Sequence, residues 1–284
     1  MRRRATWALV GAAAGVLLLF LTWLLAFHVG IFQRADQSVL AGFTRLKSHP
    51  HVGGVAARIA DLCDPRPYVF FCAIPIVLAL VRRRLPVALA IGAILLGANA
   101  TTELVKPLLA HARAASLLGG ASPVGPASWP SGHATAAMAL ALCMVLAVPA
   151  RLRPLTAVLG GAFAVAVSYS FLTLGWHYPS DVLGGYLVAG IWTMLGVAAV
   201  FAFESRGERA GTEDLPARQS VREALGPPAV ALAAAVALAG LILLARPHEV
   251  VSYARVHEAF IVGAAAIGAI GLTLVTGLML ALRR

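Results

Sequence analysis

The sequence has few charged residues, and acidic residues are especially scarce. Only 12% of its 284 residues are charged, and 12 Asp and Glu stand against 23 Lys and Arg. Soluble globular domains carry about 25% charged residues, so this composition excludes an ordinary soluble domain. Apolar residues make up 60% of the chain instead. The composition therefore predicts a membrane protein.

Cysteine is also rare, with three residues in the whole chain. Cys63, Cys72 and Cys143 show neither the spacing of a metal site nor an even number for pairing. Cys72 and Cys143 lie inside apolar runs, where a free cysteine behaves as a small hydrophobic side chain. The cysteines therefore predict neither a disulfide framework nor a thiolate metal site.

Apolar runs close to the length that crosses a bilayer recur along the chain. Because lipid offers no partner for unpaired backbone groups, several such runs predict an all-α fold, a polytopic transmembrane helical bundle. The first run is too long for a secretory signal core and is interpreted as an uncleaved span. The expected spans are residues 5–27, 67–81, 85–105, 133–150, 155–175, 181–203, 227–245 and 259–282.

The excess of arginine is distributed as a topology signal. Short basic clusters lie before the first span, between alternate spans and at the C-terminus, which puts 14 Lys and Arg on one face and nine on the other. The positive-inside rule predicts that the clustered face, with both termini, is cytoplasmic in the plasma (inner) membrane. The basic charge is thus explained by the bilayer, and no nucleic-acid partner is expected.

Polar residues gather on the opposite, outer face. The segment 106–132 leaves one span and enters the next, and it ends in the sequence Pro-Ser-Gly-His at 130–133. The spans 133–150 and 155–175 form a hairpin that returns residues 176–181 to the same face. His133 and His177 are therefore expected to be neighbours although 44 residues separate them.

These residue types suit phosphoryl transfer. Two histidines can divide the roles of nucleophile or base and of acid. Asp181, four residues after His177, can hold one ring nitrogen protonated and leave the other free to attack. Cations and helix-start amides beside them form an anion cradle. The residues expected in this cradle are Lys106, Arg113, Ser131 and Gly132.

The polar residues fall into three motifs: K-x6-R at Lys106–Arg113, PSGH at 130–133 and H-x3-D at His177–Asp181. In order and spacing they resemble the signature of the type 2 phosphatidic acid phosphatase superfamily of integral-membrane lipid phosphatases. The resemblance implies a six-span phosphatase core at 1–203. The segment 204–226, which mixes charges with Gly and Pro, is predicted to be a cytoplasmic linker, and the two extra spans in 227–284 lie outside the resemblance.

The resemblance also implies a role for each motif residue. His177, oriented by Asp181, would attack phosphorus and form a phosphohistidine, and His133 would protonate the leaving oxygen. No metal and no other cofactor is implied. The phosphate-binding residues implied are Lys106, Arg113, Ser131 and Gly132.

Two positions depart from the family pattern. Arg113 is followed by Ala114 where the family usually has proline, and Phe171 stands where the third motif usually has arginine. Losing one charged anchor of a transition state costs about 10²–10³ in rate by analogy with oxyanion donors. A weak enzyme, a reshaped site and a protein without activity therefore all remain open.

The preferred hypothesis is a metal-independent lipid phosphatase acting at the outer face. The substrate classes implied are polyprenyl diphosphate, phosphatidic acid and phosphatidylglycerophosphate. One alternative is a phosphotransferase on the same scaffold, and another is a catalytically impaired lipid-phosphate-binding protein. The oligomeric state is left open.

Four further interpretations concern packing. Glu103 is expected to pair with Lys106 on one helix face. Gly184 and Gly185 are expected to allow close helix contact, and residues 35–47 to form an amphipathic interfacial helix. Two tryptophans beside the polar segments are interpreted as interfacial side chains: Trp129 and Trp176.

Overall fold

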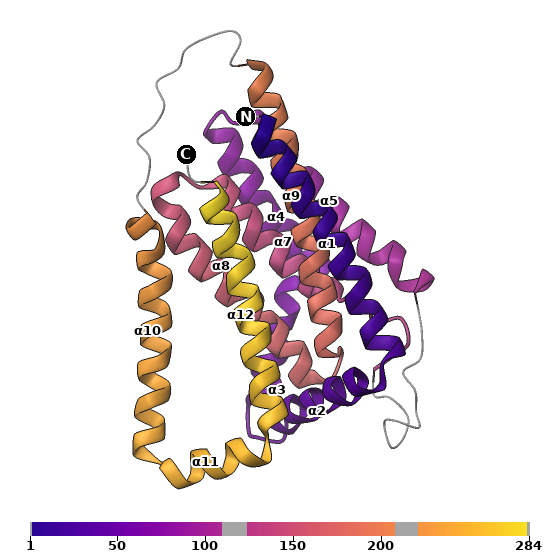
Figure 1. Cartoon of the computed structure of the whole chain (residues 1–284), viewed down its shortest axis with the longest axis vertical. Helices are drawn as coiled ribbons and strands as arrows, with labels where there is room; N and C mark the ends of the chain where they lie inside the picture. Colours follow the sequence, from indigo (N-terminus) through magenta and orange to yellow (C-terminus); the bar gives the residue numbers. More distant parts are fainter. Residues whose placement is uncertain (1, 110–123, 208–220, 283–284) are drawn as a thin grey trace.

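The computed structural model describes residues 2–109, 124–207 and 221–282, and the regular structure of these parts is entirely helical (Figure 1). The predicted all-α class is confirmed. The long helices of the first two parts are α1 (Arg2–His28), α2 (Gly30–Leu46), α3 (Val52–Ala60), α4 (Pro65–Val81), α5 (Leu85–Leu108), α7 (Gly132–Ala147), α8 (Arg153–Leu174) and α9 (Pro179–Gly207). The short 3-10 helix η1 (Asp61–Cys63) lies between α3 and α4, and η2 (Ala150–Leu152) lies between α7 and α8. The last part holds α10 (Val221–Ala245), α11 (Pro247–Val256) and α12 (Glu258–Ala281).

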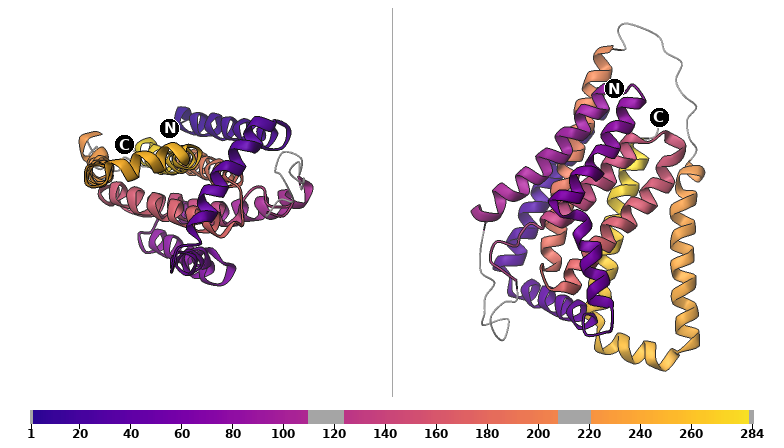
Figure 2. Two further views of the ribbon diagram at one scale, coloured as in Figure 1. Left: turned by 90° about the horizontal axis from the view of Figure 1, so that it is seen from below. Right: turned by 180° about the vertical axis from the view of Figure 1, so that it is seen from behind.

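Each predicted span corresponds to one long helix that runs between the two ends of the bundle (Figures 1 and 2). Among the described residues, six of these helices are long and apolar enough to cross a membrane alone: α1, α5, α8, α9, α10 and α12. The predicted span 67–81 lies in α4, which passes this test only together with the segment Val52–Cys63, bent from it by 57°. The helix found at the predicted span 133–150 is α7, which is shorter than expected because it ends at Ala147. The protein is thus a multi-pass membrane protein.

Helix α7 occupies the centre of the bundle. Every residue from Ala134 to Ala147 is buried except Met144, as expected for a helix that is apolar on all sides. Its 16 residues rise about 24 Å, less than the hydrocarbon core of a bilayer. Small side chains on α7, chiefly alanine, let α5, α8 and α9 approach it closely.

Two glycines bring α9 against the start of α7. A Cβ at Gly185 would lie 2.6 Å from the Ser131 carbonyl oxygen, and one at Gly184 would lie 2.7 Å from Nε1 of Trp129. The predicted close packing is confirmed. The interfacial interpretation of Trp129 is wrong, because this side chain is buried in that contact with 2% exposure. Trp176, by contrast, is 44% exposed.

Helices α2 and α11 lie across one end of the bundle (Figures 1 and 2). The helix expected at 35–47 is found as α2, which begins earlier, at Gly30. Its buried residues recur at helical spacing, from Gln33 to Phe43. The Phe43 ring contacts the Phe260 ring of α12 at 4.9 Å between centroids.

The two C-terminal spans differ in how they pack. Helix α12 joins the bundle beside α8, where the Tyr169 hydroxyl donates to the Ala264 carbonyl and Arg153 Nη1 donates to the Leu282 carbonyl at 2.9 Å. Helix α10 stands at the outer edge of the molecule (Figure 1). The division at 203 and 227 stays a prediction, and most of the linker lies outside the described residues.

Replacement of Gly185 by alanine tests the contact between α9 and α7. The added methyl group meets the backbone of Ser131 and Thr135 and the Cβ of Ala134 at 2.6–2.9 Å, so we expect destabilisation of about 1–3 kcal/mol from overpacking. The apparent melting temperature in detergent should fall. Gly277→Ala is the matched control, because nothing lies within 4 Å of its Cβ position, and equal melting temperatures of the two variants would contradict this packing.

Candidate active site

The two histidines of the motifs lie at one end of the bundle, where α7 begins and α8 ends. His133 is the second residue of α7. His177 follows α8, which Gly175 ends in a left-handed conformation with φ 79° as glycine commonly does. Pro179 then starts α9, at a position where proline is favoured. The two imidazole centroids are 6.5 Å apart, so the topology brings the histidines together as expected.

Asp181 lies beside the inner nitrogen of His177. Its Oδ2 is 3.4 Å from His177 Nδ1 and accepts a hydrogen bond from the Tyr178 amide at 2.9 Å. The carboxylate is fully buried. The 3.4 Å separation is longer than a formed hydrogen bond, and Nδ1 has no other hydrogen-bond partner among the described residues. A short movement would complete the bond, as is common in unliganded sites.

A backbone hydrogen bond joins the second and third motifs. The Ser131 amide donates to the Asp181 carbonyl at 2.9 Å. Ser131 is also the N-cap of α7, with its Oγ accepting from the Ala134 amide at 3.3 Å. The amides of Gly132 and His133 follow at the helix start, where an α-helix leaves N–H groups without internal partners. Such a helix start attracts anions.

Lys106 projects toward this helix start from the last turn of α5. A Cβ at Gly132 would lie 3.1 Å from Lys106 Nζ, so the glycine leaves room for the ammonium group beside its amide. Lys106 Nζ donates to Glu103 Oε1 at 2.6 Å, and this predicted pair is confirmed. Arg113 lies outside the described residues.

Phe171 fills the position of the missing motif arginine. Its ring is fully buried and lies 5.2 Å from the His177 ring and 6.0 Å from the His133 ring, between centroids. The Trp176 ring lies 5.9 Å from His133 on the more exposed side. Phe171 and Trp176 thus form an aromatic wall beside the two histidines: Phe171 contacts both imidazole rings, and Trp176 contacts that of His133.

Sequence reasoning missed two carboxylates that contact the motifs. Asp64, before α4, has its Oδ1 3.1 Å from His133 Nε2. Asp36 of α2 accepts hydrogen bonds from both the amide of Ser180, at 2.9 Å, and its hydroxyl. Both acids precede the first motif, at sequence distances of 69 and 144 residues from their partners. The available signal was their acidic character in a chain with few acids.

An apolar groove leads from the site along α4 and α5. The cavity has a volume of about 750 Å³. Glu103, Lys106, Gly132 and His133 line one part of it, and the rest is mainly apolar. The other lining residues are Cys63, Pro65, Tyr68, Val69, Cys72, Ala73, Ile76, Gly92, Leu95, Leu96, Asn99, Ala100 and Ala136.

No cluster of three or more potential metal ligands occurs within the described ranges. The expected independence from metals and other cofactors stays a prediction. Of the predicted site residues, the structure brings His133, His177 and Asp181 together. Three predicted phosphate-binding residues lie around the start of α7: Lys106, Ser131 and Gly132.

Comparison with known proteins agrees with the motifs. Residues 87–205 match the PAP2 superfamily, the family that the three motifs resemble. These residues thus form a PAP2 region, and they contain every predicted site residue. The resemblance that the motifs indicate is thus confirmed for residues 87–205, and the prediction of a phosphatase rests on this region.

A solved structure is also similar to the chain. It is the first transmembrane PAP2-type phosphatidylglycerolphosphate phosphatase from Bacillus subtilis, with 20% identity and a TM-score of 0.48. The similarity covers 72% of this chain and 99% of that one. No curated protein matches the sequence significantly.

The bond between Asp36 and Ser180 is expected to hold the His177 segment against α2. Both side chains are buried, and a hydrogen bond to a charged group contributes about 1.5–3 kcal/mol. Asp36→Ala and Ser180→Ala should each lower the apparent melting temperature. Because the contact is shared, the double variant should lose less than the sum of the two single losses. Strict additivity would show that the two side chains do not interact.

Proposed function

We propose that the protein is a metal-independent lipid phosphatase that hydrolyses a phosphomonoester or diphosphate of a membrane lipid through a phosphohistidine. The observation that carries this proposal is the apolar groove that ends at His133 and Lys106. An apolar groove can hold a lipid chain while its polar end receives the phosphate. A water-soluble phosphate ester would need no such groove.

The proposed reaction begins at His177. Asp181 holds the proton on Nδ1, which leaves the Nε2 lone pair free to form a bond to phosphorus. The bond from phosphorus to the lipid oxygen breaks, and a proton from His133 neutralises that oxygen. Water then attacks the phosphohistidine, His133 takes a proton from it, and inorganic phosphate leaves.

Charge stabilisation in this mechanism comes from the start of α7 and from Lys106. The Gly132 and His133 amides and the helix dipole stabilise the negative charge on the phosphoryl oxygens. Ser131 holds the helix start in place as its N-cap. Arg113 is proposed to add a second cation, as the family pattern implies.

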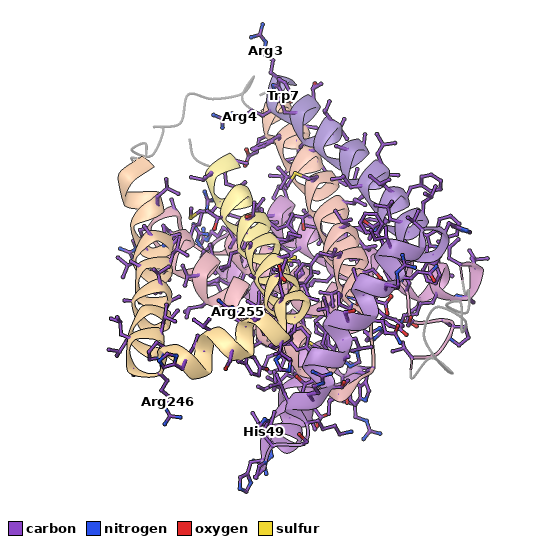
Figure 3. All side chains as sticks on the ribbon, turned by 60° about the horizontal axis from the view of Figure 1, so that its bottom comes forward. Arg3, Arg4, Trp7, His49, Arg246 and Arg255 are labelled. Atoms are coloured by element: carbon purple, nitrogen blue, oxygen red, sulfur yellow. The ribbon has the colours of Figure 1, made fainter. Side chains whose placement is uncertain are left out.

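The charge distribution supports a site on the outer face. Arg3 and Arg4 lie at one end of the molecule, whereas His49 and Arg246 lie at the other (Figure 3). The described basic clusters at 82–84 and 151–153, which follow α4 and α7, also lie at the first end (Figure 1). The positive-inside rule assigns this end to the cytoplasm. We therefore propose a plasma-membrane location with cytoplasmic termini and an extracytoplasmic site.

The proposed substrates are lipid phosphates of the polyprenyl diphosphate, phosphatidic acid or phosphatidylglycerophosphate type. Phe171 supports a second candidate, a lipid-phosphate-binding protein with weakened catalysis. Its buried ring offers the phosphate no charge-assisted hydrogen bond, unlike the arginine usual at this position.

Phosphate release tests the proposed reaction. The purified full chain in detergent, with a chelator present, should release inorganic phosphate from at least one of the three lipid classes. His177→Ala should abolish release, because the variant lacks the nucleophile, and should lose the acid-labile phosphoenzyme seen by rapid acid-free quenching with radiolabelled substrate. His49→Ala is the matched control, since His49 is exposed and points away from the bundle (Figure 3).

The outcomes separate the two candidate functions. Release that is lost in His177→Ala and kept in His49→Ala supports the phosphatase. Lipid phosphate that binds the wild-type chain without phosphate release supports the impaired binding protein. Release that continues in His177→Ala would overturn the phosphohistidine mechanism.

Filling the groove tests the role assigned to it. A Cβ at Gly92 has open space around it, and Gly92 lines the groove, so Gly92→Phe should obstruct a long chain. We expect the KM for a long-chain lipid phosphate to rise about tenfold, the loss expected for displacing roughly two buried methylenes, with little change for a short-chain analogue. Gly277→Phe on α12, also in open space, should leave both KM values unchanged. An equal rise for both chain lengths in Gly92→Phe would contradict the groove's role.

A further inference from the structure

A carboxylate from outside the PAP2 region contacts His133. Asp64 lies between η1 and α4, and the family match begins only at residue 87. Its Oδ1 is 3.1 Å from His133 Nε2, within hydrogen-bond distance. None of the three motifs includes this acid, so its role must be derived from its surroundings.

The local sequence explains why this carboxylate is available. Asp64 is the N-cap of α4, a position where aspartate usually accepts a hydrogen bond from the second or third amide of the helix. Here Pro67 occupies the third position of α4 and has no amide hydrogen, so only the Arg66 amide at the second position could serve as the capping donor. The side chain makes no capping hydrogen bond. The carboxylate therefore contacts His133 rather than its own helix.

The contact also determines which His133 nitrogen can serve the substrate. Because Nε2 faces Asp64, Nδ1 is the nitrogen left to exchange a proton with another group. His133 lines the groove and keeps 25% of its side chain exposed. A carboxylate on one imidazole nitrogen fixes the ring orientation and stabilises the imidazolium form, as an aspartate does in a catalytic triad.

We propose that Asp64 is a positioning residue that holds His133 through Nε2, so that Nδ1 delivers the proton to the leaving lipid oxygen. This inference rests on the proposed phosphatase function. When the bond from phosphorus to the lipid oxygen breaks, that oxygen takes the Nδ1 proton. The bond electrons stay on the oxygen, and His133 becomes neutral with its remaining proton on Nε2, donated to Asp64. In the second half, Nδ1 accepts a proton from the attacking water.

The competing explanation is a merely structural ion pair. Exposed pairs contribute little to stability, and the Asp64 side chain is 50% exposed. A structural pair would affect all substrates alike. A positioning role would instead affect substrates according to how strongly their leaving oxygen needs a proton.

The test compares two phosphate esters. Phosphatidic acid has an alkoxide leaving group that needs a proton, whereas p-nitrophenyl phosphate has a phenolate that leaves without one. For Asp64→Ala we expect kcat/KM on phosphatidic acid, which reports phosphoryl transfer to His177, to fall about ten- to a hundredfold, part of the contribution of general acid catalysis. The kcat/KM on the aryl ester should be nearly unaffected, because hydrolysis of the phosphohistidine, common to both esters, does not enter this ratio. Asp61→Ala, an exposed acid three residues earlier, should match the wild type on both esters.

An equal loss of kcat/KM on both esters, or no loss on either, would overturn the proposal. If Asp64→Ala does not keep the wild-type melting temperature, Asp64→Asn takes its place with the same expectations. Asn retains the shape of the side chain but removes the charge that stabilises the imidazolium.

A second measurement does not depend on turnover. Diethyl pyrocarbonate acylates neutral imidazole but not imidazolium, the form that a carboxylate on Nε2 stabilises. Mass spectrometry should show faster acylation of His133 in Asp64→Ala than in the wild type or in Asp61→Ala, with exposed His49 as internal reference. An unchanged rate would overturn the Asp64 contact. A wild-type chain without phosphatase activity would contradict the proposed function, while this measurement would still decide the contact.

Discussion

The hydrogen bond from the Ser131 amide to the Asp181 carbonyl joins the starts of α7 and α9. Gly184 and Gly185 make the bond possible, because any side chain there would collide with residues 129–135. Two helix N-termini thus lie side by side at one end of the bundle. Both helix dipoles place positive charge there, and an anion bound in this space would be stabilised before any side chain contributes. The distance between the His133 and His177 rings depends on this junction, because each histidine lies beside one of the two helix starts.

The acids near the site are engaged with specific partners. Asp181 lies beside the Nδ1 of His177, and Asp64 beside the Nε2 of His133. Glu103 pairs with Lys106, and Asp36 accepts two hydrogen bonds from Ser180. Negative charge close to a phosphate site is unfavourable unless it is neutralised. In the proposed mechanism these carboxylates orient the groups that meet the phosphate.

The aromatic wall changes the electrostatics of the site. Phe171 packs against both imidazole rings in place of a guanidinium. An arginine would offer planar, charged donors to the phosphoryl oxygens, whereas a buried phenyl ring excludes water and offers none. In the proposed mechanism the helix starts and Lys106 therefore supply a larger share of the charge stabilisation. The apolar groove along α4 and α5 continues this low-polarity environment toward the lipid.

The sequence alone determined the all-α class, six of the eight predicted spans and the motif residues, because bilayer thickness sets the length of apolar runs and because motif spacing is a local property. The positions of His133 and His177 at one end followed from counting crossings. Only the tertiary structure decided that Asp64 and Asp36 contact the motifs and that Trp129 is buried. It also decided that α12 packs beside α8 while α10 lies at the edge. These contacts join residues far apart in the chain, and no local pattern encodes them, because they depend on which helix faces meet.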